Sequence, residues 1–379
     1  MKMQLWLQLW LIAAARVLKH SGLIFVSSML IWPLAAGSVE APTSNIPVFP
    51  GKSWEDIPPT SLSLECRAQL NKARDHLHTL DTTALLAVKD GKVLFSYGST
   101  SLVSILFSAR KSILAMLYGK YIAEGTIDLE KNLADLGIDD LSGLLPTERQ
   151  AKLRHLLTAR SGVYHLAANS GDDLASAPPR GSQVPGTYFL YNNWDFNAAG
   201  TAFEALTKQS IYQAFANDFA NPLQLEDFDL ARHRRSGDLT KSEHAAYHFY
   251  LSTRDMARLG YLMLQQGSWR GQQLIPASWI TTMTTTVTPA AEMHPPKTAR
   301  RQFGYGYLWW TLEDPPNSPL HGAYMAWGVH GQYILVIPSH HMVIAHKRQV
   351  PVAGKWDVSW VTPSDFLAAA KILTSAPCQ

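Results

Sequence analysis

The sequence predicts a mixed α/β fold of the α+β type, in which helices flank one antiparallel sheet built from both ends of the chain. Near the N-terminal end, two apolar runs flank Asp90-Gly91, a dipeptide typical of a two-residue hairpin turn. Near the C-terminal end, apolar runs at 332–338 and 342–346 predict two strands joined by a short turn. Between these ends, up to about residue 285, the pattern is mainly that of helices and loops. We therefore expect a mostly helical domain inserted into the sheet domain.

Helical patterns recur along the chain. Ile113 and Leu117 belong to an apolar set at helical spacing, and Gly125 ends that segment as a C-terminal cap. The segment 147–150 has the residue types of a capping box at a helix start. Together these patterns predict helices over 63–79, 108–125, 147–159, 252–266 and 363–374, with an aromatic strand over 305–311.

The same patterns predict the domain organisation. The helix that begins at Ser108 is expected at the interface between a sheet domain and a helical domain. The predicted parts are a signal peptide or N-terminal anchor over 1–37, a linker over 38–59, an α/β domain from 60–107 and 286–379, and a helical domain over 108–285.

Length and composition favour a folded enzyme-sized protein. The 379 residues are enough for two domains, and a hydrophobic content of 46% supports a sizeable core. The formal net charge is only +3, and no run of five Lys or Arg residues occurs. These values disfavour a nucleic-acid-binding protein, which would carry a basic patch.

The N-terminal segment has the features of a secretory signal. Lys2 supplies a basic start, 23–36 is almost wholly apolar, and small residues at 35–38 provide a cleavage point. We therefore expect an exported protein, periplasmic or secreted. A retained N-terminal membrane anchor is the alternative, and membrane association is expected only through this segment.

Two cysteines are present, Cys66 and Cys378. In an exported protein, two cysteines near opposite ends of the chain can form one disulfide. Two buried free thiols are the alternative, and the sequence leaves both open.

Ser108 and Lys111 form the first candidate catalytic pair. Residues three apart on a helix lie on one face, so the lysine amine is within reach of the serine hydroxyl. A serine hydroxyl becomes a nucleophile when a base takes its proton, and burial can lower the pKa of a lysine enough for this task. A Ser-x-x-Lys tetrapeptide alone is equally compatible with a capping serine and a solvated lysine. The apolar run 102–107 and the amphipathic helix that follows favour the catalytic interpretation.

Two further motifs follow in the chain. Tyr191 and Asn193 come after a Pro-Gly turn, and their side chains can relay a proton and bind a substrate carbonyl. The segment 328–332 leads into a strand, and small residues at a strand edge let a substrate approach the backbone. The N–H groups of Ser108 and Gln332 are the expected oxyanion donors. Each motif by itself also fits an ordinary core tyrosine or a glycine-rich bend.

The order of the three motifs resembles the layout of the serine β-lactamase and D,D-peptidase superfamily. After residue 60 the sequence resembles the β-lactamase-related serine hydrolases, which include class C β-lactamases and penicillin-binding-protein relatives. This resemblance implies a site between an α/β domain and a helical domain. It implies Ser108 as acylated nucleophile, Lys111 as base, Tyr191 as proton relay and Asn193 as substrate ligand. The segments that carry it are 108–112, 156–162, 185–187, 191–197 and 331–338.

The third motif departs from the penicillin-recognising pattern, which has Lys-Thr-Gly or a His-x-Gly variant. Aligned through Gly331, the chain has Val329-His330-Gly331 and lacks the cation that receives the substrate carboxylate. His330 or an arginine from a loop could replace that cation. His330, Gly331 and Gln332 are the expected substrate contacts of this motif. The departure favours an esterase or amidase acting on a neutral substrate.

Two rival interpretations stay open: a true β-lactamase or D,D-carboxypeptidase, and a non-catalytic homologue that binds a cell-wall peptide or a partner. The expected substrate is a small molecule or a peptide, and the oligomeric state is not predicted. No cofactor or metal site is predicted, because His244 and His248 are four apart but lack the glutamate of a His-Glu-x-x-His motif. The chain has no Gly-x-Ser-x-Gly elbow, which disfavours an α/β-hydrolase.

Overall fold

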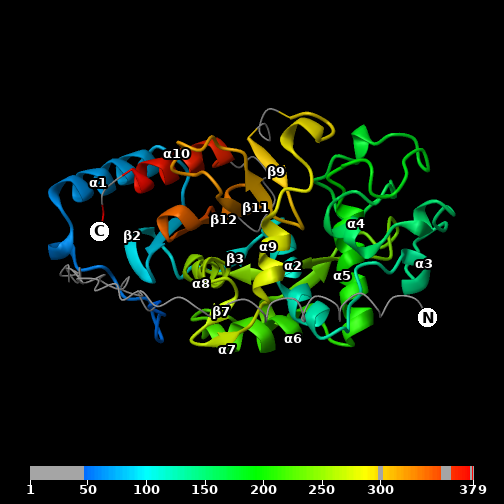
Figure 1. The fold of residues 1–379 in the computed structure, drawn as a ribbon, viewed down its shortest axis with the longest axis horizontal. Coiled ribbons are helices and arrows are strands. Elements are labelled where there is room, and N and C mark those ends of the chain that lie inside the picture. Colours follow the sequence, from blue (N-terminus) through cyan, green and yellow to red (C-terminus); the bar gives the residue numbers. More distant parts are fainter. Residues whose placement is uncertain (1–46, 298–301, 351–359, 376–377, 379) are drawn as a thin grey trace, which may run out of the picture. The chain divides into compact units, whose positions relative to one another are not determined.

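A seven-stranded antiparallel sheet joins the two ends of the chain in the computed structural model (Figure 1). Its strand order is β2-β1-β13-β12-β11-β10-β9, so strands from the N-terminal part pair directly with the last strand of the chain. This confirms the predicted fold class. The strands are β1 (Ala84–Lys89), β2 (Lys92–Gly98), β9 (Phe303–Tyr305), β10 (Trp310–Leu312), β11 (Tyr324–Gly328), β12 (Gln332–Ile337) and β13 (Met342–Lys347).

The structure describes residues 47–297, 302–350, 360–375 and 378. The predicted signal or anchor over 1–37 and the first part of the predicted linker lie outside these residues. From Pro47 onward the chain forms one compact unit. Among the described residues, no helix combines the length and the apolar character that crossing a membrane requires.

The β1–β2 hairpin forms where Asp90-Gly91 predicts it. Both turn residues have positive φ, 49° for Asp90 and 82° for Gly91, which is the backbone of the favoured two-residue turn. Glycine is needed for a second reason, because a Cβ at position 91 would lie 1.9 Å from the Val48 carbonyl oxygen. The hairpin turn therefore also packs against the N-terminal segment around Val48.

Helices cover both faces of the sheet (Figure 1). On one face, α1 (Leu64–His78) packs beside α10 (Pro363–Thr374), whose Phe366 stacks on Tyr333 of β12. On the other face lies α8 (Thr253–Leu264), which contacts β1, β12 and β13. Successive residues of β12 serve the two faces, as strand geometry requires.

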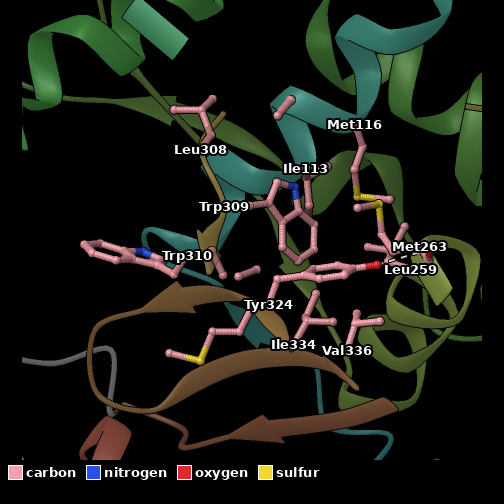
Figure 2. Close-up of a cluster of buried hydrophobic side chains, with 14 of the residues drawn as sticks. Ile113, Met116, Leu259, Met263, Leu308, Trp309, Trp310, Tyr324, Ile334 and Val336 are labelled. Atoms are coloured by element: carbon pink, nitrogen blue, oxygen red, sulfur yellow. Dashed lines mark hydrogen bonds between the residues drawn. The ribbon is translucent and has the colours of Figure 1, made fainter. Parts of the chain in front are cut away.

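The core beneath α8 extends to α2 (Ala109–Ala123), as Figure 2 shows. Ile334 and Val336 of β12 point toward Leu259 and Met263 of α8, and Ile113 lies close by. At position 260 a Cβ would lie 2.5 Å from a Val343 methyl carbon, so α8 sits close against the sheet. Helix α2 also contacts β11, α5 (Asn193–Thr207) and α9 (Ala277–Thr284), so it lies between the sheet and these helices.

The two cysteines form a disulfide between Cys66 of α1 and Cys378 near the C-terminus, with Cα atoms 5.0 Å apart. Of the two alternatives left open by the sequence, the structure shows the bonded one. The bridge fastens the C-terminal segment beside α10 to the first helix, over a sequence separation of 312 residues.

Six of the predicted helices and strands can be compared with the structure at their boundaries. Helices α1, α2, α8 and α10 form within two residues of their predicted bounds. The helix predicted over 147–159 is wrong as a continuous element, because it consists of a short 3-10 turn (Glu148–Gln150) and α4 (Leu153–Leu157). Thr147 makes no side-chain cap, and the Glu148 carboxylate instead binds Arg180 and the Leu145 N–H. The strand predicted over 305–311 is a hairpin, in which β9 pairs with β10.

The division into domains at 107/108 and 285/286 stays a prediction, although α8, which lies within the range of the expected helical domain, packs on the sheet. Within the range of the expected helical domain, the α-helices besides α2 and α8 are α3 (Leu133–Leu136), α4 (Leu153–Leu157), α5 (Asn193–Thr207), α6 (Ile211–Phe215), α7 (Asn221–Leu223) and α9 (Ala277–Thr284).

Candidate active site

Ser108 lies at the N-terminus of α2, directly after Phe107, whose φ of 47° is uncommon for a residue with a side chain. Its hydroxyl makes no capping bond to the helix. Instead, Ser108 Oγ accepts a hydrogen bond from Lys111 Nζ at 3.0 Å. The capping serine that the tetrapeptide alone allowed is therefore not what the fold builds.

Lys111 is buried and its amine is held in three directions. Besides Ser108 Oγ, Nζ donates to Tyr191 Oη at 2.6 Å and to Asn193 Oδ1 at 2.8 Å. The amine also lies 4.3 Å from the centre of the Phe196 ring. The four side chains predicted from two separate motifs thus meet at one nitrogen atom.

The segment that carries Tyr191 and Asn193 is fixed by the start of α5. Asn193 is the first residue of this helix, and Asn192 caps it by accepting the Trp194 N–H. The Asn193 amide nitrogen donates to the Ser170 carbonyl at 2.9 Å, and its backbone N–H donates to Asp172 at 3.0 Å. Burial raises the pKa of the Asp172 carboxyl, against the opposing effect of the backbone N–H groups of Asn193 and Leu174.

Ser108 and Tyr191 line a pocket of about 420 Å³, whereas Lys111 and Asn193 lie behind them and do not belong to its described lining. Aromatic rings form much of its wall. Figure 2 shows how the sheet supplies one of them: Trp309 points into the core, whereas Trp310 points away from it. The lining comprises Phe107, Ser108, Arg110, Asn169, Ser170, Gly171, Asp172, Asp173, Tyr191, His248, Lys297, Trp310, Trp327, Val329 and Trp360.

The third motif lies only partly at the pocket. His330, Gly331 and Gln332 do not belong to the described lining of the pocket, whereas Trp327 and Val329 do. Gln332 instead pairs with Gly328 across the β11–β12 hairpin, and its side-chain amide donates to the Arg348 carbonyl.

His330 and Gly331, the other two residues of the third motif, pack against neighbouring side chains. The His330 ring packs against Phe107 and Trp360, at centroid distances of 5.3 and 5.0 Å. Gly331 has φ 103° in the hairpin turn and lies against Val361.

The glycine that meets the nucleophile helix is Gly328, three positions before Gly331. A Cβ at Gly328 would lie 2.2 Å from the Leu106 carbonyl oxygen and 3.1 Å from the Ala109 nitrogen. The end of β11 therefore touches the backbone on both sides of Ser108, and Val329, the next residue, lines the pocket. One sequence signal pointed this way: Gly328 ends an apolar run, where a strand edge is expected, and Gly331 lies in the turn.

His244 and His248 do not share a helical face. The segment forms the short strand β5 (Ala246–His248), and His244 lies before it. His244 Nε2 is 2.8 Å from the Asp139 carbonyl oxygen, and Nδ1 is 3.1 Å from Thr201 Oγ1. His248, in contrast, lines the pocket.

Solved structures share this fold at low sequence identity. A penicillin-binding protein homologue from Caulobacter crescentus superposes with a TM-score of 0.57 at 13% identity, covering 82% of this chain and 97% of that one. A β-lactamase from Mycobacterium bovis gives 0.53 at 18% identity, covering 80% and 99%. A family VIII carboxylesterase gives 0.56 at 14% identity, covering 83% and 97%.

Among curated proteins, an uncharacterized protein of Alkalihalophilus pseudofirmus is 28% identical over 102 residues. That match covers 25% of this chain and 28% of the relative. The family model described as Beta-lactamase matches residues 71–346, which include every strand of the sheet from β1 to β12 and all four residues around Lys111 Nζ. The chain belongs to the Beta-lactamase family.

Proposed function

We propose that the protein is a serine hydrolase that cleaves a small ester, or an amide, through an acyl-enzyme on Ser108. The observation that carries the proposal is the position of Lys111 Nζ, 3.0 Å from Ser108 Oγ and 2.6 Å from Tyr191 Oη at the wall of a pocket. A nucleophile, a base within hydrogen-bond reach and a third group that orients the base are the parts that acyl transfer needs.

In the first half of the reaction, Lys111 acts in its neutral form. The hydrogen bond between Nζ and Ser108 Oγ then runs the other way, and Oγ gives its proton to Nζ while it attacks the substrate carbonyl carbon. Burial in a low-dielectric site disfavours the charged form of an amine, which supports this role. The N–H groups of Ser108 and Val329 would hold the oxyanion. The tetrahedral intermediate then expels the leaving alkoxide, which receives its proton from Lys111 through Tyr191.

In the second half, a water molecule attacks the acyl-enzyme carbonyl carbon. The same amine and phenol take its proton and return one to Ser108 Oγ as the acid product leaves. The balance is one ester and one water in, and one acid and one alcohol out.

The kinetic test compares the wild type with Ser108→Ala on a short-chain nitrophenyl ester and on a chromogenic cephalosporin. We expect ester hydrolysis by the wild type and its loss in Ser108→Ala, with an unchanged circular-dichroism spectrum. Ser101→Ala, at an exposed serine seven positions earlier, is the matched control and should keep full activity. Ester turnover that survives Ser108→Ala would overturn the proposal, and preferential cephalosporin turnover would make the protein a β-lactamase instead.

A further inference from the structure

Arg110 is a buried cation at the wall of the same pocket, and the reaction proposed above does not use it. It is only 2% exposed. Its Nη2 donates to Asn197 Oδ1 at 3.1 Å, and the guanidinium lies over the Tyr247 ring, 4.7 Å from its centre. Nε and Nη1 are buried without a hydrogen-bond partner.

A second unpartnered group lies nearby. His248 also lines the pocket, and its Nδ1 is buried without a hydrogen-bond partner. Burial and, next, the Arg110 charge lower the pKa of His248 to about 3, so the imidazole is neutral and able to donate one hydrogen bond. Asn169, another lining residue, accepts a hydrogen bond from Asn197 at 2.9 Å and so belongs to the same polar group.

The carboxylates of the pocket wall are occupied elsewhere. Asp173 forms an ion pair with Lys297, and Asp172 accepts the backbone N–H groups of Asn193 and Leu174. Among the described residues, no carboxylate forms an ion pair with Arg110. A buried guanidinium without a counter-ion is costly, and the cost falls when an anion reaches it.

The pocket also limits what that anion can be. Its volume is about 420 Å³ and its wall is largely apolar; among the described lining residues, Lys297 is paired with Asp173, whereas Arg110 has no carboxylate partner. These properties suit a small monoanion on an apolar chain better than a phosphate, which would need several cations. A guanidinium hydrogen-bonds a carboxylate with charge-assisted strength.

We propose that Arg110, with His248 beside it, is a carboxylate-binding subsite, and that the substrate is a short half-ester whose acyl chain ends in a carboxylate. Hydrolysis of the half-ester rests on the proposed function, whereas binding of its carboxylate at Arg110 does not. Ser108 and Arg110 line the same pocket of about 420 Å³, so an acyl chain of a few carbons can span from the nucleophile to the guanidinium. The subsite supplies the cation that the third motif lacks, and it replaces the neutral substrate expected from the sequence.

The test measures binding to the full chain carrying Ser108→Ala, which does not turn substrate over. The two ligands are mono-4-nitrophenyl glutarate and its methyl ester, which have the same chain and differ in the terminal charge. We expect a Kd for the half-ester at least tenfold lower than that of the methyl ester. Equal affinities would overturn the proposal.

Arg110→Gln, added to Ser108→Ala, is expected to reduce the preference to less than about threefold. Arg234→Gln is the matched control, because Arg234 also adds positive charge near His248 but does not line the pocket. It should keep the preference. A folded Arg110→Gln variant that retains the full preference would place the anion elsewhere.

If Arg110→Gln fails to fold, Arg110→Lys takes its place, since it keeps the charge but cannot reach both positions of Nε and Nη1. The preference must then fall at least threefold, and an undiminished preference would overturn the subsite. Turnover of both esters by the wild type is recorded separately. Intact binding preference without turnover would remove the hydrolase assignment and leave the subsite standing.

Discussion

At the scale of single residues, the chemistry converges on one nitrogen atom. Lys111 Nζ donates to a hydroxyl, a phenol and an amide oxygen, all within 3.0 Å. Because Ser108 and Lys111 belong to the same helix turn, their contact follows from helix geometry and could be predicted from the sequence. Asn193 reaches the amine from the first position of α5 and Tyr191 from the segment before it, and only the resemblance between whole motifs connected them with Ser108 and Lys111 in advance.

Replacement of Lys111 by methionine tests the base. Lys111→Met keeps the length of the side chain and removes the amine, so we expect kcat/KM for ester hydrolysis to fall by about 10²–10⁴-fold. Lys120→Met, nine residues later on α2 at a partly exposed ion pair with Asp218, is the control and should retain activity. A Lys111→Met variant that folds and hydrolyses ester at the wild-type rate would refute general-base catalysis by this residue.

The third motif shows what the sequence could not settle at this scale. Gly328 and Gly331 both occur in a glycine-containing segment, and either could align with the family pattern. The choice depends on which one meets the backbone of α2, and that contact joins positions more than 200 residues apart. Only the three-dimensional structure identifies Gly328.

Gly328→Ala should therefore disturb the oxyanion site. Its new Cβ would push β11 away from the carbonyl oxygen of Leu106 and the nitrogen of Ala109, which displaces the Val329 N–H. Since loss of one oxyanion donor costs on the order of 10²–10³-fold in kcat, we expect a loss of at least ~10²-fold. Gly51→Ala, where a Cβ meets nothing within 4 Å, is the control. Equal activity of the two variants would contradict the assigned role of the β11 edge.

At the scale of elements, amphipathic helices and turn residues were predictable, and short interrupted helices were not. The β1–β2 hairpin, α2 and α10 follow local signals that act over a few residues. The segment predicted as a helix over 147–159 has the composition of a capping box, but Glu148 serves Arg180 instead of the helix N-terminus. A tertiary ion pair overrides the local preference there.

Strand β13 carries a buried lysine whose titration is testable. Lys347, on β13, is buried, and its amine donates to the carbonyls of Ser104 and Leu251 at 2.8 and 2.5 Å. Burial lowers the pKa of Lys347 to about 7, against the opposing effect of Asp255. Between about pH 7 and the ordinary lysine pKa, the unfolded chain therefore binds the proton that the folded chain has released.

The free energy of unfolding should accordingly rise with pH across this window through Lys347, by up to roughly 1.4 kcal/mol per pH unit. Lys347→Met should remove this contribution, so that the variant shows a shallower rise than the wild type in urea denaturation between pH 7 and 10. Lys89→Met, at a half-buried lysine on β1, should leave the slope as it is. Parallel curves for the wild type and Lys347→Met would contradict a neutral buried amine.

At the scale of the whole molecule, the sheet and one disulfide bring the two ends of the described chain together. The sequence predicted that both ends contribute strands, because the alternating and apolar runs lie there. It did not predict that β13 would insert between β1 and β12, since strand order depends on packing of α8 and α10 against opposite faces. It also left the pairing of Cys66 with Cys378 open.

Loss of the disulfide should lower stability without changing the site. We expect Cys66→Ser with Cys378→Ser to reduce the free energy of unfolding by about 2–5 kcal/mol, because the bridge restricts the unfolded chain over a long loop. The described lining of the pocket includes neither cysteine, so the folded variant should keep its kcat/KM. Urea denaturation of the variant, and of the wild type with reductant, provides the measurement. Identical unfolding midpoints with and without the bridge would show that it adds nothing.

The proposed acyl-enzyme is tested most directly by intact-mass spectrometry after treatment with a fluorophosphonate probe. The arrangement of Ser108, Lys111 and Tyr191 predicts a single adduct on the wild type, mapped to Ser108 and absent from Ser108→Ala. A folded wild-type protein that forms no adduct, or one that is labelled at another serine, would contradict an activated Ser108.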